Sequence, residues 1–311
     1  MDGTLLVGVD GSPESISATR WAAEEAVRRG LVLRILHART WLDELHTGPD
    51  RPEELRSATA RMLADAEREA RRDHPKLTVE TESAAGGAPA ELLLKAAAGA
   101  ELVVLGSRGL GGFAGLVVGS VGLGVAAHCE RPTVLVRAAA VDPAERANAA
   151  AGHDASGDGS AGDGAAGDGA GEVVVGVDVR SRSTETLEFA FRQAELLGVP
   201  VRAVHGWMPP AAWGYAGWVV PQQQWTELEE VEGELLRAAA APLRARYPRL
   251  SSVLDCRIDT PAGALVAASA GAALVVVGRR HRPHPFGMHL GPTAHAVLHH
   301  AHAPVAVVPH D

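Results

Sequence analysis

The amino-acid sequence predicts an α/β protein of two similar domains, each built on a parallel sheet with helices on both faces. The chain has 311 residues, which suits two domains of roughly 100–200 residues each. Short, continuously apolar segments alternate with helix-like segments, as expected for parallel strands that are buried on both faces. The same succession of segments occurs twice, which indicates a duplicated unit rather than a solenoid.

The first strand and the first helix have clear signals. Residues Thr4–Asp10 and Glu172–Asp178 are both apolar runs that end in Val-Gly-Val-Asp. Ser12-Pro13-Glu14 then has a capping serine, a proline at the first helical position and an acid in the first turn. A helix is therefore expected directly after the first strand.

The later elements repeat in the same order. Further paired strands are expected at Val32–Ala38 and Val199–His205, Leu102–Gly106 and Leu274–Gly278, and Pro132–Val136 and Pro304–Val308. Two long, charged segments with apolar residues at helical spacing, Glu53–Arg72 and Gln223–Arg246, are expected to be helices. In such a doubly wound fold the ligand lies outside the carboxyl ends of the strands.

A change in amino-acid composition indicates the boundary between the two halves. Residues 139–171 consist mainly of Ala, Gly, Asp and Ser, which cannot bury enough apolar surface to offset the entropy of ordering. We interpret them as a flexible linker, a passive tether between a first domain at 1–138 and a second at 172–311.

Composition excludes some classes of function. The net charge of −9 argues against nucleic acid as a partner, because duplex binding usually needs a basic face. The two cysteines, Cys129 and Cys256, do not suggest a disulfide framework, and Cys129 is expected to be a small buried thiol. No secretory signal and no apolar run of about 20 residues is found, so we expect a cytoplasmic protein without membrane contact.

The motif with the most chemical information follows the strand Leu102–Gly106. Gly106, Gly109, Gly119 and Ser120 form the pattern G-x2-G-x9-G-S, and a helix-like segment begins at Ser120. Glycines let a backbone approach an anion closely, and the first amides of the helix point toward it. The segment therefore predicts a phosphate site, and the competing interpretation is a tight turn without a ligand.

Together with Val7-Gly8-Val9-Asp10-Gly11-Ser12, this motif resembles the universal stress protein family of the nucleotide-binding type. The resemblance covers nearly the whole chain, twice over. It implies domains of five parallel strands in a Rossmann-like fold, which bind ATP at the carboxyl ends of the strands and act in the response to stress.

The resemblance also implies roles for particular residues of the first half. Asp10 would meet the ribose hydroxyls, and the backbone of Ala38 would contact adenine. Arg108 is a candidate phosphate partner, although it is equally well read as an exposed arginine, and for Asp10 the alternative is helix capping. The groups expected to hold the phosphates are Gly106, Gly109, Gly119, Ser120 and Val121.

The second half departs from this pattern. Aligning Gly278 with Gly106 places His281 at the second glycine and Pro292 at the position of Ser120, and only Gly291 matches Gly119. Proline removes an N–H donor together with the hydroxyl. We therefore expect ATP mainly in the first domain.

Two clusters in the second half have open interpretations. The aromatic cluster is read as a packed loop, or else a lid or partner surface, and comprises Trp207, Trp213, Trp218, Trp225 and Tyr215. The histidine cluster is read as surface histidines without metal, although His295 and His299 have metal-pair spacing, and it comprises His281, His284, His289, His295, His299, His300 and His302.

The sequence favours binding over catalysis. The Walker motif is absent, and the two lysines, Lys76 and Lys95, lie outside the glycine loop. Three hypotheses remain: an ATP-binding stress regulator, a slow ATPase or phosphotransferase, and a nucleotide-free dimerising scaffold. The expected cofactor is ATP, with or without Mg²⁺. The expected partners are an unidentified protein, the other domain through the last strands Thr133–Val136 and Val305–Val308, and a second chain in a homodimer.

Overall fold

The computed structural model describes residues 3–39, 51–108, 118–137, 171–181, 184–209, 222–280 and 290–311, with the backbone alone at 51–55 and 222–224. Residues 139–170 of the expected linker, Trp213 to Trp218 and His281 to His289 lie outside these residues, as does Gly109.

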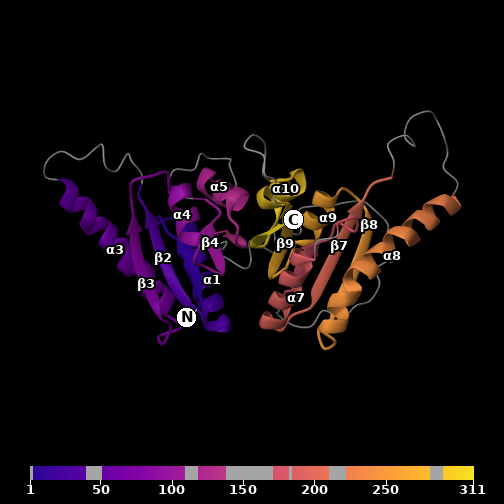
Figure 1. Ribbon diagram of the computed structural model, residues 1–311, viewed down its shortest axis with the longest axis horizontal. Coiled ribbons are helices and arrows are strands. Elements are labelled where there is room, and N and C mark those ends of the chain that lie inside the picture. The colour runs from indigo at the N-terminus through magenta and orange to yellow at the C-terminus, as the bar shows by residue number, and fades with distance from the viewer. Residues whose placement is uncertain are drawn as a thin grey trace.

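Both halves have the expected succession of elements (Figure 1). The first contains β1 Thr4–Gly8, α1 Pro13–Arg29, β2 Val32–Ala38, α3 Arg51–Arg71, β3 Val79–Ala84, α4 Pro89–Ala97, β4 Leu102–Gly106, α5 Ser120–His128 and β5 Thr133–Val136. The second contains β6 Val173–Gly176, α7 Glu185–Leu197, β7 Val201–Trp207, α8 Gln222–Arg246, β8 Ser252–Ile258, α9 Pro261–Ala268, β9 Leu274–Arg280, α10 Pro292–His300 and β10 Val305–His310. The α/β fold class predicted from the sequence is confirmed.

Within the described residues, all strands join one ten-stranded sheet in the order β3-β2-β1-β4-β5-β10-β9-β6-β7-β8. Neighbouring strands are parallel within each half, whereas β5 and β10 pair antiparallel, with Val134 opposite Ala306. These are the strands that the sequence analysis expected to pair. Because each would otherwise be an exposed edge, their pairing satisfies backbone groups on both domains.

Alternation along the strands produces two cores, one on each face of the sheet. Leu5 and Val7 face one core, and Leu6 faces the other. The first core is covered by α1, α3, α7 and α8, and the second by α4, α5, α9 and α10. In Figure 1 the long helices α3 and α8 lie at opposite outer ends, and α5 and α10 lie near the middle.

The local signals for α1 are confirmed. Ser12 is its N-cap and accepts a hydrogen bond from the Ser15 amide at 3.2 Å, Pro13 is the first helical residue, and Gly30 ends the helix with φ of 66°. Gly198 ends α7 in the same way, with φ of 69°. These two glycines occupy equivalent positions in the two halves.

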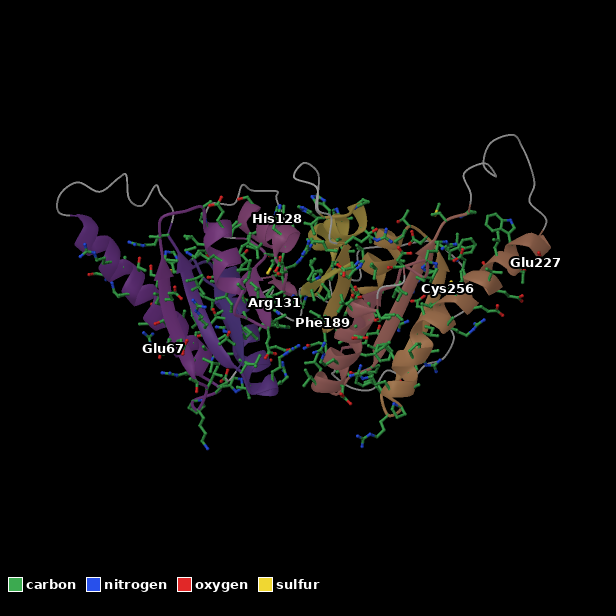
Figure 2. All side chains as sticks on the ribbon, viewed as in Figure 1. Glu67, His128, Arg131, Phe189, Glu227 and Cys256 are labelled. Carbon is green, nitrogen blue, oxygen red and sulfur yellow. The ribbon has the colours of Figure 1, made fainter. Side chains whose placement is uncertain are left out.

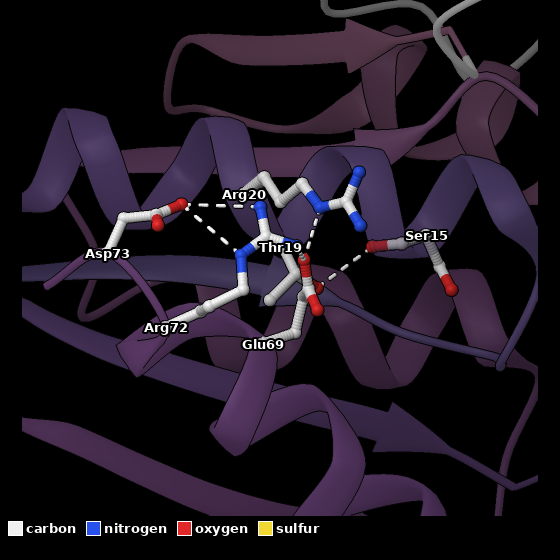
Figure 3. Close-up of polar contacts among 6 residues, drawn as sticks. All are labelled: Ser15, Thr19, Arg20, Glu69, Arg72 and Asp73. Carbon is white, nitrogen blue, oxygen red and sulfur yellow. Dashed lines mark hydrogen bonds and ion pairs between the residues drawn. The ribbon is translucent and has the colours of Figure 1, made fainter. Parts of the chain in front are cut away.

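Polar contacts join α1 to α3 on the same face of the sheet (Figure 3). Arg20 of α1 pairs with Glu69 of α3, and Arg72 reaches both Glu69, at 2.9 Å, and Asp73. These pairs are partly exposed and contribute little each. They fix the position of α1 relative to α3. The formation of α1 itself depends on burial of Ala18, Ala22 and Ala26.

A buried polar network joins the domains between α1 and α7. Gln193 donates to the Glu25 carboxylate at 2.9 Å, and both side chains are fully buried. Counted back from Gly30 and Gly198, these two residues occupy equivalent positions. Arg29 bonds to both of them, at 2.5 Å and 2.6 Å, and lies over the ring of Phe189, which Figure 2 labels near the middle of the molecule.

Two arginines join the domains on the other face. Arg137, after β5, donates to the carbonyls of Leu298 and His299 at the end of α10, at 3.1 Å and 3.0 Å. Arg279 of β9 is buried and donates to the Cys129 carbonyl, which follows α5, at 2.5 Å. Both guanidiniums therefore lie at the carboxyl end of a helix of the other domain, where a cation is favoured.

Candidate functional site

The crevice in the first domain lies where the strand order reverses. β1 has β2 on one side and β4 on the other. The helix after β1, α1, packs on the first core, whereas the helix after β4, α5, packs on the second. The loops after these strands consequently diverge and open a crevice at the carboxyl edge of the sheet, which is where ligands bind in doubly wound folds.

Asp10 lies at this edge, two residues after the end of β1. Its Oδ1 accepts hydrogen bonds from the Ser12 amide at 3.0 Å and from the Ser12 hydroxyl at 2.6 Å. Ser12, not Asp10, is the N-cap of α1, and Asp10 supports this cap through Ser12. These hydrogen bonds also hold the Asp10 carboxylate in one orientation at the crevice, which is a useful property in a ligand-binding acid.

Gly106, the last residue of β4, has a packing reason to be glycine. A Cβ at this position would lie 2.9 Å from the Glu14 carbonyl carbon and 3.0 Å from the Ser15 amide nitrogen. The start of α1 can therefore approach the end of β4 only because residue 106 has no side chain. Gly106 shapes the crevice through this approach, so its identity alone is not evidence for a phosphate.

The N-terminus of α5 closes the other side of the crevice. Gly119 is its N-cap, and the Gly119 amide donates to the Ser107 carbonyl at 2.8 Å, which ties the helix start to the end of β4. Ser120 and Val121 begin the helix. The amides of these first residues have no carbonyl in their own helix to bond, and the helix dipole makes this end positive.

Two arginines, Arg108 and Arg137, follow the carboxyl ends of β4 and β5. Arg108 pairs with Glu14 at 3.1 Å and remains 46% exposed at its side chain. Burial, and then the positive charge of Arg108, lower the pKa of Arg137. The Arg137 guanidinium itself donates to the carbonyls of Leu298 and His299 at the end of α10. Arg137 was not found from the sequence, because it is the residue directly after β5 and matches no motif.

Ala38, the last residue of β2, lies at the same edge. The Val9 amide donates to the Leu36 carbonyl at 2.9 Å, which is the last ladder bond between β1 and β2. Since strand groups alternate in direction, the Ala38 N–H and C=O point toward the same side, beyond that bond. The backbone of Ala38 is therefore directed over the region next to Asp10.

The described site residues that the sequence singled out thus converge on one edge of the first domain: Asp10, Ala38, Gly106, Arg108, Gly119, Ser120 and Val121. Gly109 lies outside the described residues. Glu14 was recognised from the sequence as an acid of the first helical turn, but not as the residue that positions Arg108. The signal for this second role is weak, because an acid in the first turn is common owing to the helix dipole alone.

The same edge of the second domain has different charge pairing. Arg280, aligned with Arg108, bonds to Asp178 at 2.9 Å, and Asp178 is the equivalent of Asp10. The sequence has arginine at 182, the position aligned with Glu14, so the carboxylate that would hold Arg280 is replaced by a cation. At the phosphate end, Pro292 is the first residue of α10 and has no amide proton.

A cavity of about 960 Å³ opens at this edge of the second domain. The ends of β6, β7 and β9 and the start of α10 line it, as do Glu232 and part of α8. The sequence analysis did not single out Glu232, because a glutamate in a long charged helix has no distinguishing pattern.

The structure describes part of the aromatic cluster and part of the histidine cluster of the second half. Trp207 ends β7 and is buried, and Trp225 lies on α8. The rings of His295 and His299 on α10 stack with centroids 4.6 Å apart. Over the residues with a described placement, no group of three or more His, Cys, Asp or Glu side chains is arranged to hold a metal. Nor does any helix there have the length and apolarity needed to cross a membrane. Cys129 is buried, as expected.

Fold and site define the class: a tandem pair of Rossmann-like α/β domains whose candidate site residues lie at the carboxyl edge of the sheet. Within this class, the model of the universal stress protein family matches residues 1–137 and 170–309, and the chain belongs to that family.

Several known proteins are similar over their full length. Universal stress protein Rv1996 of Mycobacterium tuberculosis is 29% identical over 333 residues, which cover 99% of this chain and 96% of that protein. Universal stress protein Rv2005c of the same organism is 30% identical over 319 residues, covering 97% and 96%. Among solved structures, a universal stress protein from Archaeoglobus fulgidus DSM 4304 has a TM-score of 0.63 at 17% identity, with 98% of each chain covered, and supports the fold.

Proposed function

We infer that this universal stress protein is an ATP-binding regulator of the stress response, with ATP held mainly in the crevice of the first domain. The observation that carries the proposal is the convergence of three unlike groups on one edge of the sheet. These are the Asp10 carboxylate, the backbone of Ala38 and the N-terminus of α5 at residues 119–121. They suit ribose hydroxyls, a base edge and phosphate oxygens, respectively.

The electrostatics of the crevice support an anionic ligand at one end only. The N-terminus of α5 and the guanidinium of Arg108 provide positive potential at the end of β4. Asp10 provides negative charge at the end of β1, where a phosphate would be repelled but a hydroxyl group can donate. This polarity matches the orientation of a nucleotide that the glycine motif implies.

Binding without efficient turnover fits the described residues better than hydrolysis. Lys76 and Lys95, the two lysines of the chain, do not lie at the carboxyl edge of β1 and β4. The glycine motif also lacks the Walker lysine that would reach the outer phosphates. We therefore place the regulator ahead of the slow ATPase or phosphotransferase, and nucleotide occupancy separates both from the nucleotide-free scaffold.

The first experiment is to purify the protein, denature it and identify any released nucleotide. Titration of nucleotide-free protein with ATP, with and without Mg²⁺, then gives affinity and stoichiometry. Asp10→Ala is the test variant, and Asp178→Ala, at the equivalent position of the second domain, is its matched control. Loss of ATP binding in the first variant alone supports the proposal, whereas equal loss in both, or in neither, contradicts it. Phosphate release measured over hours decides whether bound ATP is hydrolysed.

A further inference from the structure

The crevice of the second domain contains a buried carboxylate that has no counterpart in the first domain. Leu236 of α8 and Leu63 of α3 are both buried in the first core, and each lies 16 residues before the first residue of the following strand, β8 or β3. Four residues earlier, the second domain has Glu232, and the first has Thr59. Glu232 is 5% exposed and lines the cavity of about 960 Å³. This cavity therefore differs chemically from the proposed nucleotide crevice.

Arg180 covers the carboxylate. Its Nη1 donates to Glu232 Oε2 at 3.1 Å, and its Nη2 donates to Oε1, so the pair is bidentate. The side chain of Arg180 is 63% exposed, whereas that of Glu232 is 7% exposed. Arg180 also occupies the position that aligns with Ser12, the helix cap of the first domain. The exposed guanidinium of Arg180 thus covers the buried carboxylate of Glu232.

His205 contacts the same carboxylate through its other ring nitrogen, opposite the one that contacts Val177. Its Nδ1 lies 3.0 Å from the Val177 carbonyl, and its Nε2 lies 3.2 Å from Glu232 Oε2. A carbonyl and a carboxylate only accept, so the ring serves both contacts when both nitrogens carry protons. Burial would raise the pKa of Glu232, but hydrogen bonds from Arg180 and His205 and their positive charges lower it overall. Glu232 is therefore charged at neutral pH.

The surroundings of Glu232 are consistent with a carboxylate that stays negatively charged. Cys256 lies on β8 in the second domain, as Figure 2 shows, and its thiol pKa is raised first by burial and then by the charge of Glu232. Trp207 and Met208, at the end of β7, form an apolar wall of the same cavity, and Met208 is 59% exposed. A buried carboxylate beside apolar surface suits a cation that carries a short apolar chain.

We propose that the second-domain crevice binds a small monosubstituted guanidinium compound, whose guanidinium pairs with Glu232 in the place that Arg180 occupies. Arg180 then acts as a displaceable occupant. The exchange conserves the bidentate pair, because one guanidinium replaces another on the same two oxygens. The Arg180 side chain is 63% exposed, so its release returns to water a guanidinium that is already partly hydrated, and it frees a long side chain that the pair immobilises.

The test is calorimetric titration of the full chain with 1-butylguanidinium, using the neutral isostere 1-butylurea as the control probe. Because the Arg180 end of the pair is exposed, we take the pair to shift an equilibrium by a factor of about five. Removal of this competitor in Arg180→Ala should therefore tighten butylguanidinium binding about two- to sixfold relative to the unchanged chain. Glu232→Gln keeps the size of the side chain but removes its charge, and it should weaken binding at least about tenfold.

Arg68→Ala is the matched control variant, because Arg68 pairs with Asp65 on α3 in the first domain, far from the cavity in sequence and in fold. It should bind the probe as the unchanged chain does. Tighter binding in Arg180→Ala, with no binding of butylurea, supports the proposal. Equal binding of the two probes, or no butylguanidinium binding in Arg180→Ala while its circular dichroism is native, overturns it and leaves the Arg180–Glu232 pair as a structural contact.

Discussion

Replacing Arg29 with alanine tests the polar network that fixes the two domains against each other. Arg29 is 11% exposed at its side chain and bonds to Glu25, which is fully buried, and to Gln193 of the other domain. Without it, the Glu25 carboxylate keeps the Gln193 amide at 2.9 Å and a distant Arg28 nitrogen at 3.6 Å. A buried charge that has lost its partner costs about 3–5 kcal/mol, so we expect Arg29→Ala to be strongly destabilising.

The neighbouring arginine provides the control. Arg28 is 33% exposed and pairs mainly with Glu24, which is 52% exposed, so Arg28→Ala should cost at most about 1 kcal/mol. Both variants are measured by urea unfolding of the full chain, followed by circular dichroism. Adding Glu25→Gln to Arg29→Ala should recover at least about 1 kcal/mol, since it removes the unpaired charge. If Arg29→Ala costs no more than Arg28→Ala, the network does not stabilise the domain pairing.

Three further predictions concern the site and its surroundings. Asp10→Ala and Gly109→Ala should each weaken ATP binding about tenfold or more in calorimetric titration, with native circular dichroism. Gly106→Ala places a methyl group 2.9 Å from the backbone at the start of α1 and should cost about 1–3 kcal/mol in urea unfolding. Burial, followed by the charges of neighbouring histidines and an arginine, lowers the pKa of His299 below its ordinary value of about 6.5. The unfolded chain then binds a proton more readily, so stability should fall as the pH drops below that value, and His299→Gln should reduce the fall.

Much of the fold could be predicted because its strands are buried on both faces. Segments such as Thr4–Gly8 and Leu102–Gly106 are almost wholly apolar, and the chain repeats them in order. The start of α1 was equally clear, since Ser12, Pro13 and Glu14 each satisfy a different requirement of a helix N-terminus. The position of Asp10 and of the glycine motif at one edge follows from strand order alone.

Charge pairing could not be predicted in the same way. Arg108 and Arg280 occupy aligned positions, yet one pairs with Glu14 and the other with Asp178. The outcome depends on which acid lies within reach across the crevice, and that is a property of tertiary structure. Glu232 illustrates the same limit, because only the packing of α8 decides which of its many charged residues faces inward.

The contacts between the domains could not be predicted from the sequence either. Glu25 and Gln193 are separated by 168 residues and have no local pattern, and they meet because β5 and β10 pair around Val134 and Ala306. A homodimer stays a prediction. Since β5 and β10 are used within the chain, a second chain would have to bind through another surface.

The most direct test of the account is the stoichiometry of ATP on the intact chain. The first domain provides the amides and hydroxyl at the start of α5, whereas the second has Pro292 at that position and a salt bridge on Asp178. Loss of two charge-assisted hydrogen bonds weakens binding by about two to four powers of ten. We predict about one ATP per chain, with binding weakened about tenfold or more in Gly109→Ala. Two sites of equal affinity, or full binding in that variant, would contradict the account.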